Sequence, residues 1–240
     1  MSRAKKELGV DSMGVQKSMR LTDYLGDGIG QLPLNIMTCL VGQLTYFYTE
    51  KVGLAAGMVA TMLLISKILD AFTDLIMGKI VDEGKSKKGK CRPWFIRMAI
   101  PAFVAIIILF TVPKNVDGNL QAAYVLITNI LITAVVYTAI SIPYGALMAI
   151  RTESSEERGK MGICRATFGY IAGMVIVILL IPITNMLGGT QEAWIKAAVV
   201  FALISLLSLL FLYKVTRENK VLETDSEEKV PFLEELGMLF

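Results

Sequence analysis

The chain has 240 residues, of which 54% are hydrophobic and only 19% are charged, and its mean hydropathy is +0.59. A soluble domain carries about a quarter charged residues, so this composition argues against a soluble protein. A net charge of +3, without a basic stripe interleaved with aromatic residues, argues against a nucleic-acid partner. Histidine is missing from the sequence, and Cys39, Cys91 and Cys164 do not have the spacing of a metal site, so zinc is not expected.

Six apolar stretches follow a polar and basic segment at residues 1–29, which carries no signal peptide and is expected in the cytoplasm. We predict transmembrane helices at residues 30–49, 54–81, 94–113, 119–147, 161–186 and 194–214. Each stretch approaches or exceeds the length of about 20 residues that crosses a bilayer. The predicted fold class is an all-α membrane protein, because open strands cannot satisfy their backbone groups in lipid.

Basic residues alternate between the predicted loops. The loop after the second helix reads DEGKSKKGKCRPW, and basic residues also follow the fourth and sixth helices, whereas the opposite loops are short and carry little charge. Because positively charged loops stay in the cytoplasm, we predict a multi-pass protein of the inner (cytoplasmic) membrane with both termini cytoplasmic.

The last segment, residues 215–240, is predicted to be a cytoplasmic linker. Its final stretch, VPFLEELGMLF, reads either as the start of a helix that enters the membrane or as a short surface helix. The first reading indicates half of a larger transporter.

The second predicted helix carries Lys67, Asp70 and Asp74 near its middle. An ionisable group in hydrocarbon costs roughly 2.5–3.5 kcal/mol, so such residues face a partner or a cavity. At about 100° per residue the three side chains share one face of the helix. Two carboxylates one turn apart suit a sodium ion or a proton, which relieves their repulsion. The alternative is a structural lysine–aspartate bridge.

The fourth predicted helix contributes hydroxyl groups from Tyr137, Thr138, Ser141 and Tyr144. Thr138 and Ser141 lie on one face and are able to complete a cation's oxygen shell, or else to join helices by hydrogen bonds. Arg165, near the start of the fifth helix, is a candidate for binding a substrate hydroxyl through its planar donor groups. Its alternative is to extend to the cytoplasmic surface.

The segments YFYTEKVGL, LDAFTDLIMGKIVD, GKCRPW and SIPYGAL, in this order, resemble the glycoside–pentoside–hexuronide cation symporters. This melibiose-permease-like family belongs to the major facilitator superfamily, and the resemblance covers about residues 24–214. It implies a twelve-helix symporter made of two six-helix bundles, each with 3+3 inverted repeats, of which this chain matches the N-terminal one. The implied partners are a small glycoside, membrane lipids and a missing C-terminal bundle or second chain. No cofactor is implied beyond a coupling sodium ion or proton.

The resemblance places the coupling ion at Asp70 and Asp74 with Thr138, and the polar cluster adds Ser141 as a further hydroxyl. The candidate substrate-binding residues are Arg165, Tyr137, Tyr144, Asn35 and Lys67. The candidate gating loop contains Gly78, Asp82, Lys87, Lys88 and Lys90. Anchoring to lipid headgroups is the alternative role of its lysines.

The sequence departs from the family at several positions. Ser141 stands where melibiose permease has an acidic residue, and Gly145 stands where it has a tryptophan. The acidic position of the first helix falls on Leu34 or Gln31. These differences favour a different sugar.

Two readings compete with sugar–cation symport: a lipid or amphiphile transporter of the same superfamily, and a half-transporter that is inactive alone. An enzyme is not expected, because the aspartate spacing lacks the D-x-x-D-G pattern of the CDP-alcohol transferases.

Overall fold

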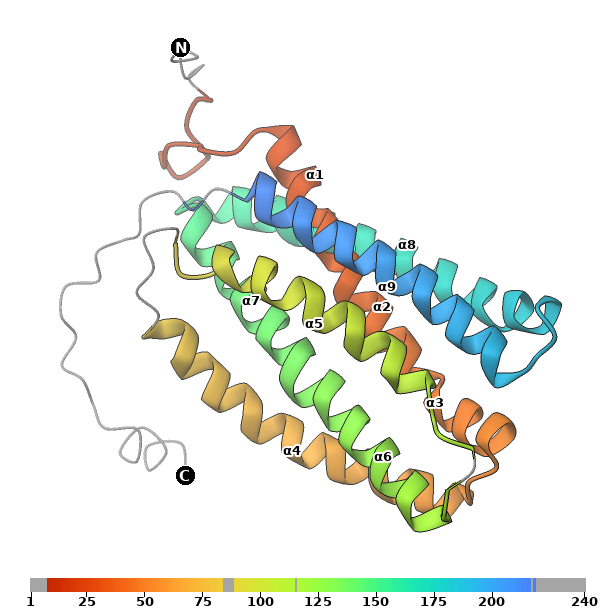
Figure 1. The fold of residues 1–240 in the computed structure, drawn as a ribbon. Coiled ribbons are helices and arrows are strands. Elements are labelled where there is room, and N and C mark those ends of the chain that lie inside the picture. The colour runs from red at the N-terminus through yellow and green to blue at the C-terminus, as the bar shows by residue number, and fades with distance from the viewer. Residues whose placement is uncertain (1–7, 84–88, 115, 217, 219–240) are drawn as a thin grey trace.

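The computed structural model describes residues 8–83, 89–114, 116–216 and 218. Within these residues the only β-structure is an isolated bridge between Val10 and Gln16, which confirms the all-helical class. The elements of Figure 1 are α1 Leu21–Ile29, α2 Gln31–Gly42, α3 Leu44–Tyr46, the π-helical η1 Phe47–Val52, α4 Ala56–Asp82, α5 Arg92–Phe110, α6 Gly118–Ile130, the π-helical η2 Leu131–Tyr137, α7 Thr138–Arg151, α8 Ser155–Met186 and α9 Gln191–Val215. The expected linker at residues 215–240 lies almost wholly outside the described residues.

Helical structure begins earlier than the sequence predicts. The first span is expected at residues 30–49, whereas α1, α2, α3 and η1 follow one another from residue 21 to residue 52. The glycine-rich run GDGIG looks like a loop in the sequence, but Gly28 lies where α1 touches α8. A Cβ atom at Gly28 would lie 2.6 Å from the ring of Phe168. Glycine here allows two helices to approach closely, as small residues do in membrane bundles.

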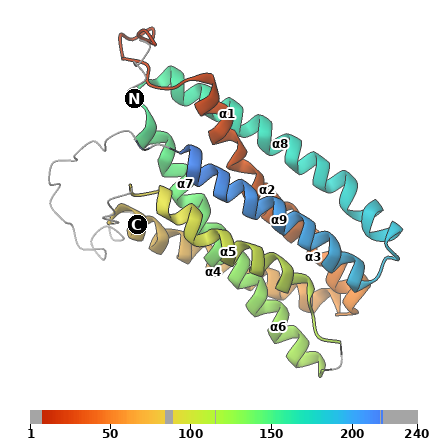
Figure 2. The ribbon, with the colours of Figure 1, turned by 45° about the horizontal axis from the view of Figure 1, so that its top comes forward.

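The helices pack as long antiparallel and parallel neighbours. α5 lies along α9, α1 and α2 lie along α8, and α4 lies along the rod formed by α6, η2 and α7. In Figures 1 and 2 the ends of α4, α7 and α9 share one end of the bundle with the starts of α5 and α8. The described residues that flank the connections predicted to be basic therefore lie at the same end.

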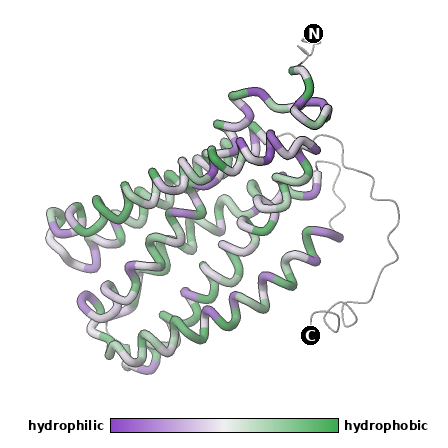
Figure 3. Tube along the Cα trace, turned by 180° about the vertical axis from the view of Figure 1, so that it is seen from behind, coloured by the Kyte–Doolittle hydropathy of each residue, from purple (hydrophilic) through white to green (hydrophobic). Residues whose placement is uncertain are grey.

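Within the described part of the chain, four helical rods are long and apolar enough to cross a membrane: Arg92–Phe110, Gly118–Arg151, Ser155–Met186 and Gln191–Val215. The sequence predicts six spans, and this finding confirms four of them. That α4 and residues 21–52 also cross the membrane stays a prediction. Figure 3 shows long hydrophobic stretches along the helices. On α8 the exposed side chains include Ile171, Met174 and Ile178.

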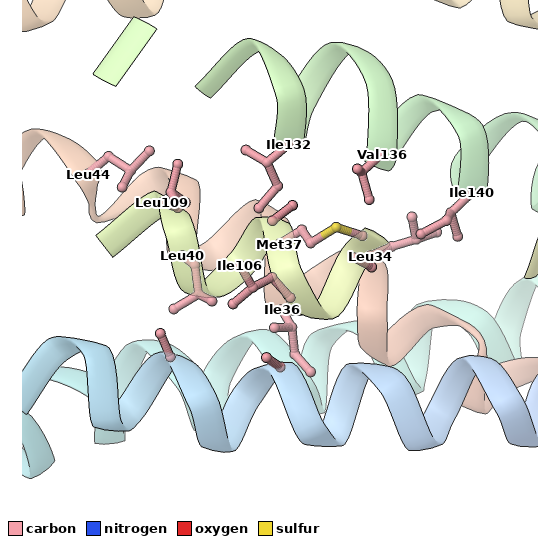
Figure 4. Packing of buried hydrophobic residues seen from close by; sticks show 14 of the residues in the cluster. Leu34, Ile36, Met37, Leu40, Leu44, Ile106, Leu109, Ile132, Val136 and Ile140 are labelled. Atoms are coloured by element: carbon pink, nitrogen blue, oxygen red, sulfur yellow. The ribbon is translucent and has the colours of Figure 1, made fainter. Parts of the chain in front are cut away.

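The packed core lies where α2 meets α5 and the rod that contains η2. In Figure 4 Met37 and Leu40 of α2 lie among Ile106 of α5 and Ile132 of η2, and all four side chains are buried. Between membrane helices such contacts stabilise mainly by close van der Waals packing, because lipid tails are as apolar as the core. This packing holds α2 against α5 and against the rod that contains η2.

A short folded loop at residues 9–18 packs against the start of α8. Ser154, which caps α8, donates its hydroxyl to the Asp11 carboxylate over 2.6 Å. This hydrogen bond holds the pKa of the Asp11 carboxyl below its usual range. The buried Glu157 accepts the backbone N–H of Met19 at 2.9 Å. Part of the N-terminal segment is therefore attached to the bundle.

Candidate functional site

Asp70, Asp74 and Thr138 come together between α4 and α7. The hydroxyl oxygen of Thr138 lies 2.8 Å from Oδ1 of Asp74 and 3.4 Å from Oδ1 of Asp70. A hydroxyl has a single proton, so it donates to one acceptor at a time, and the shorter distance favours Asp74. The second carboxylate and the lone pairs of Thr138 then remain as oxygen donors for a cation.

Local helix geometry explains this meeting. Asp70 and Asp74 are four residues apart in α4 and therefore neighbours on one face. Thr138 is the first residue of α7, directly after the π-helical turn η2, and its hydroxyl also lies 3.2 Å from the carbonyl oxygen of Thr133. Single π-turns inside α-helices are frequent at functional sites because they shift the direction of the following side chains.

Lys67 forms an ion pair with Asp70 over 3.2 Å, and the lysine side chain is 66% exposed whereas that of Asp70 is 16% exposed. The structural lysine–aspartate bridge, one of the two readings of the sequence, is therefore present at Asp70. Ser141 donates its hydroxyl to the carbonyl oxygen of Thr138 over 3.4 Å, and its place in a cation shell stays a prediction.

A second polar cluster joins α1, α7 and α8 around Asp27, whose carboxylate has no exposed surface. Arg165 donates to it from Nε over 2.6 Å and from Nη2 over 3.0 Å. Arg151 donates to it over 3.3 Å and also pairs with Asp23 at 3.7 Å. Arg165 is thus held inside the bundle, and the alternative of a surface-directed side chain does not describe it.

Two of the other candidate substrate residues lie beside this cluster. The ring of Tyr144 lies under the guanidinium of Arg165, 3.7 Å from its carbon to the ring centroid, and the Tyr144 hydroxyl donates to the Asp27 carbonyl over 2.7 Å. Asn35 lies one turn further along the bundle and faces Gly169 of α8, whose added Cβ would lie 3.0 Å from the Asn35 amide nitrogen. Tyr137 packs at the edge of the hydrophobic core instead.

The candidate gating loop is described only in part. Gly78 and Asp82 lie in the last turns of α4, and Lys90 stands directly before α5. The backbone N–H of Lys90 donates to the carboxylate of Glu218 over 2.7 Å. Lys87 and Lys88 lie outside the described residues.

Sequence reasoning missed Asp27, Arg151 and Glu157, which form the best-connected buried polar contacts of the bundle. Asp27 and Arg165 are 138 positions apart, so no local spacing pairs them. The available signal is the single charged residue of the glycine run GDGIG, directly before the first predicted span, where a buried carboxylate needs a partner. Among the described residues no group of three or more His, Cys, Asp and Glu side chains is arranged to hold a metal ion.

Comparison with known proteins shows the family to which the chain belongs. The sequence model of the family described as "MFS/sugar transport protein" matches residues 26–240. An uncharacterised symporter of Bacillus subtilis, YnaJ, is 31% identical over 222 residues, which are 90% of this chain and 47% of that protein. The isoprimeverose transporter of Lactiplantibacillus pentosus is 28% identical, over 82% of this chain and 41% of that protein.

A putative glycoside/cation symporter of Escherichia coli, YagG, is 28% identical over 88% of this chain and 46% of its own length. The chain thus spans about half the length of the curated relatives that it matches.

Proposed function

Because the chain belongs to the MFS/sugar transport protein family, a family of transporters in the membrane and not of enzymes, we propose that it forms the N-terminal six-helix bundle of a sugar–cation symporter. In this proposal the rod from residue 21 to residue 52 and α4 also cross the membrane, and the bundle consists of two inverted repeats of three helices. Its termini face the cytoplasm, and a second bundle or chain completes the substrate site.

The observation that supports this proposal most directly is the shared position of Thr138 between two carboxylates of α4. Its hydroxyl lies 2.8 Å and 3.4 Å from Asp74 and Asp70. Two carboxylates and a hydroxyl offer the hard oxygen ligands that sodium prefers, and a proton bound between the carboxylates serves the same purpose. The coupling ion is here a co-transported substrate, so no resident cofactor is required.

The ion pair of Lys67 suggests how the empty and loaded states differ. Without a bound ion, the ammonium of Lys67 partly neutralises Asp70 at 3.2 Å. A sodium ion or proton at the two carboxylates makes this pairing unnecessary and frees the exposed lysine side chain. The summed formal charge of Lys67, Asp70 and Asp74 is −1 without the ion and zero with it, so ion binding lowers the cost of holding this site in the membrane.

Sugar binding is proposed at the second cluster. Arg165 offers Nη1, and Asn35 offers the second N–H of the amide that bonds to the Gln31 carbonyl, as donors that suit the hydroxyl groups of a glycoside. The ring of Tyr144 lies against the guanidinium and holds Arg165 in place. Both clusters involve α7, because Thr138 stands at its start and Tyr144 lies less than two turns later. A rigid α7 therefore connects ion binding with sugar binding.

The test is uptake of radiolabelled glycosides by vesicles that contain the full-length protein, with and without a sodium or proton gradient. We expect gradient-dependent uptake that is abolished in the double variant Asp70→Asn, Asp74→Asn. Undiminished coupling in that variant would refute the proposal. Uptake of a lysolipid but of no glycoside would favour the amphiphile transporter instead.

A further inference from the structure

The ion pairs that join Asp27 and its neighbours among the described residues contain as many negative as positive groups. Asp27 and Asp23 carry two negative charges, and Arg151 and Arg165 carry two positive charges. The tightest contact is between Asp27 and Arg165, at 2.6 Å and 3.0 Å, in the parallel two-bond geometry of strong arginine–carboxylate pairs. A ligand that approaches Arg165 therefore meets a guanidinium whose charge is already matched.

The geometry also limits which part of Arg165 a ligand can reach. Nε and Nη2 are bound to Asp27, and the ring of Tyr144 covers one face of the guanidinium at 3.7 Å. Nη1 of Arg165 makes no hydrogen bond within the described residues. One amino group is enough for a sugar hydroxyl, whereas a carboxylate or sulfonate prefers two parallel donors.

We propose that this bundle selects uncharged glycosides over sugars that carry a carboxylate or sulfonate. The inference rests on the proposed role of Arg165 in sugar binding and adds a substrate class to it. An acidic sugar would have to displace Asp27, which would leave a fully buried carboxylate without its main partner. If Asp27 stays in place, the sugar's anionic group loses its hydration and finds no unmatched positive charge in the cluster.

The test compares two ligands that differ only in this charge. Competition for cation-driven uptake is measured in vesicles that contain the full-length protein, with methyl β-glucoside against methyl β-glucuronide and with the corresponding galactoside and galacturonide. We expect the uncharged member of a pair to bind about 10- to 100-fold more tightly, because an anionic group would lose its hydration without finding an unmatched positive charge in the cluster. Tighter binding of the acidic members overturns the inference and leaves sugar symport standing.

Variants show whether the Asp27 cluster causes the selection. Asp27→Asn leaves one unmatched positive charge. It should lower the ratio of the affinity for the uncharged sugar to that for the acidic sugar about tenfold, or reverse the preference. The double variant Asp27→Asn, Arg165→Gln keeps the charges balanced and should retain the preference for uncharged ligands, even with weaker binding overall. If Asp27→Asn folds poorly, Arg151→Gln is the second test. It removes a positive charge from the cluster and should therefore raise the preference for the uncharged sugar.

A ratio that is unchanged in the folded single variants contradicts the inference. Cation-dependent binding of no sugar from the panel contradicts the proposed function itself, and the inference then falls with it.

Discussion

Replacing Asp74 by asparagine should weaken binding of the coupling ion by about 30- to 150-fold. Since the Thr138 hydroxyl oxygen is 2.8 Å from one carboxylate oxygen and 3.4 Å from the other, the two acidic oxygens are at most about 6 Å apart. At that separation, with an effective dielectric constant of about 20, two unit charges repel by about 3 kcal/mol. A bound cation relieves this repulsion, so loss of one charge removes about 2–3 kcal/mol from ion affinity.

The measurement is the concentration of sodium, or of protons, that gives half-maximal sugar uptake in vesicles. Asp117→Asn is the matched control, because Asp117 is an exposed carboxylate that precedes α6 in the same rod as Thr138. Thr138→Val should have a smaller effect, about 0.5–1.5 kcal/mol, because it removes a neutral ligand. If Asp74→Asn and Asp117→Asn have the same ion dependence, the carboxylate pair does not bind the coupling ion.

Three further outcomes concern stability and are measured on detergent-solubilised protein. Asp27→Ala should lower the free energy of unfolding by about 3–5 kcal/mol, because Arg165 stays buried without its carboxylate partner. Adding Arg165→Met should recover most of this loss. If stability is not recovered, the loss does not come from the unpaired charge. Ser66→Ala should change the free energy of unfolding by less than about 0.5 kcal/mol, because the buried Ser66 hydroxyl makes no hydrogen bond within the described residues. The hydrogen bond from Ser154 lowers the pKa of the Asp11 carboxyl, so the ionised carboxylate stabilises the loop at residues 9–18. This loop should be protected from proteolysis above the ordinary carboxyl pKa of 3.8 and should lose that protection as the pH falls through the lowered pKa. The variant Asp11→Asn should abolish that pH dependence.

The carboxylate site could be predicted from sequence because its geometry is mostly local. Asp70 and Asp74 lie on one helix at a spacing that fixes their relative direction, whatever the rest of the fold does. Thr138 required the family resemblance, since its partners lie 64 and 68 positions away. The structure brings these three residues together, whereas their role in ion transport stays a prediction.

The cluster around Asp27 could not be predicted for two physical reasons. The flanking glycines have low helix propensity, so local sequence favours a loop there, and only close packing against α8 makes a helix the better solution. A buried carboxylate also needs partners, and those partners, Arg151 and Arg165, come from distant helices. The same ambiguity placed the start of the first helix at residue 30 instead of residue 21.

The π-helical turn at Leu131–Tyr137 stores an extra residue within the rod that runs from α6 to α7. A π-turn holds one residue more than the α-helical turn that it replaces. Deleting one residue from this stretch would therefore restore ordinary winding and leave the two halves of the rod nearly in phase. The same deletion within α6 would rotate the preceding part of that helix by about 100° relative to Thr138. The rod should therefore tolerate the loss of a residue in the π-turn far better than the loss of a residue in the flanking α-helix.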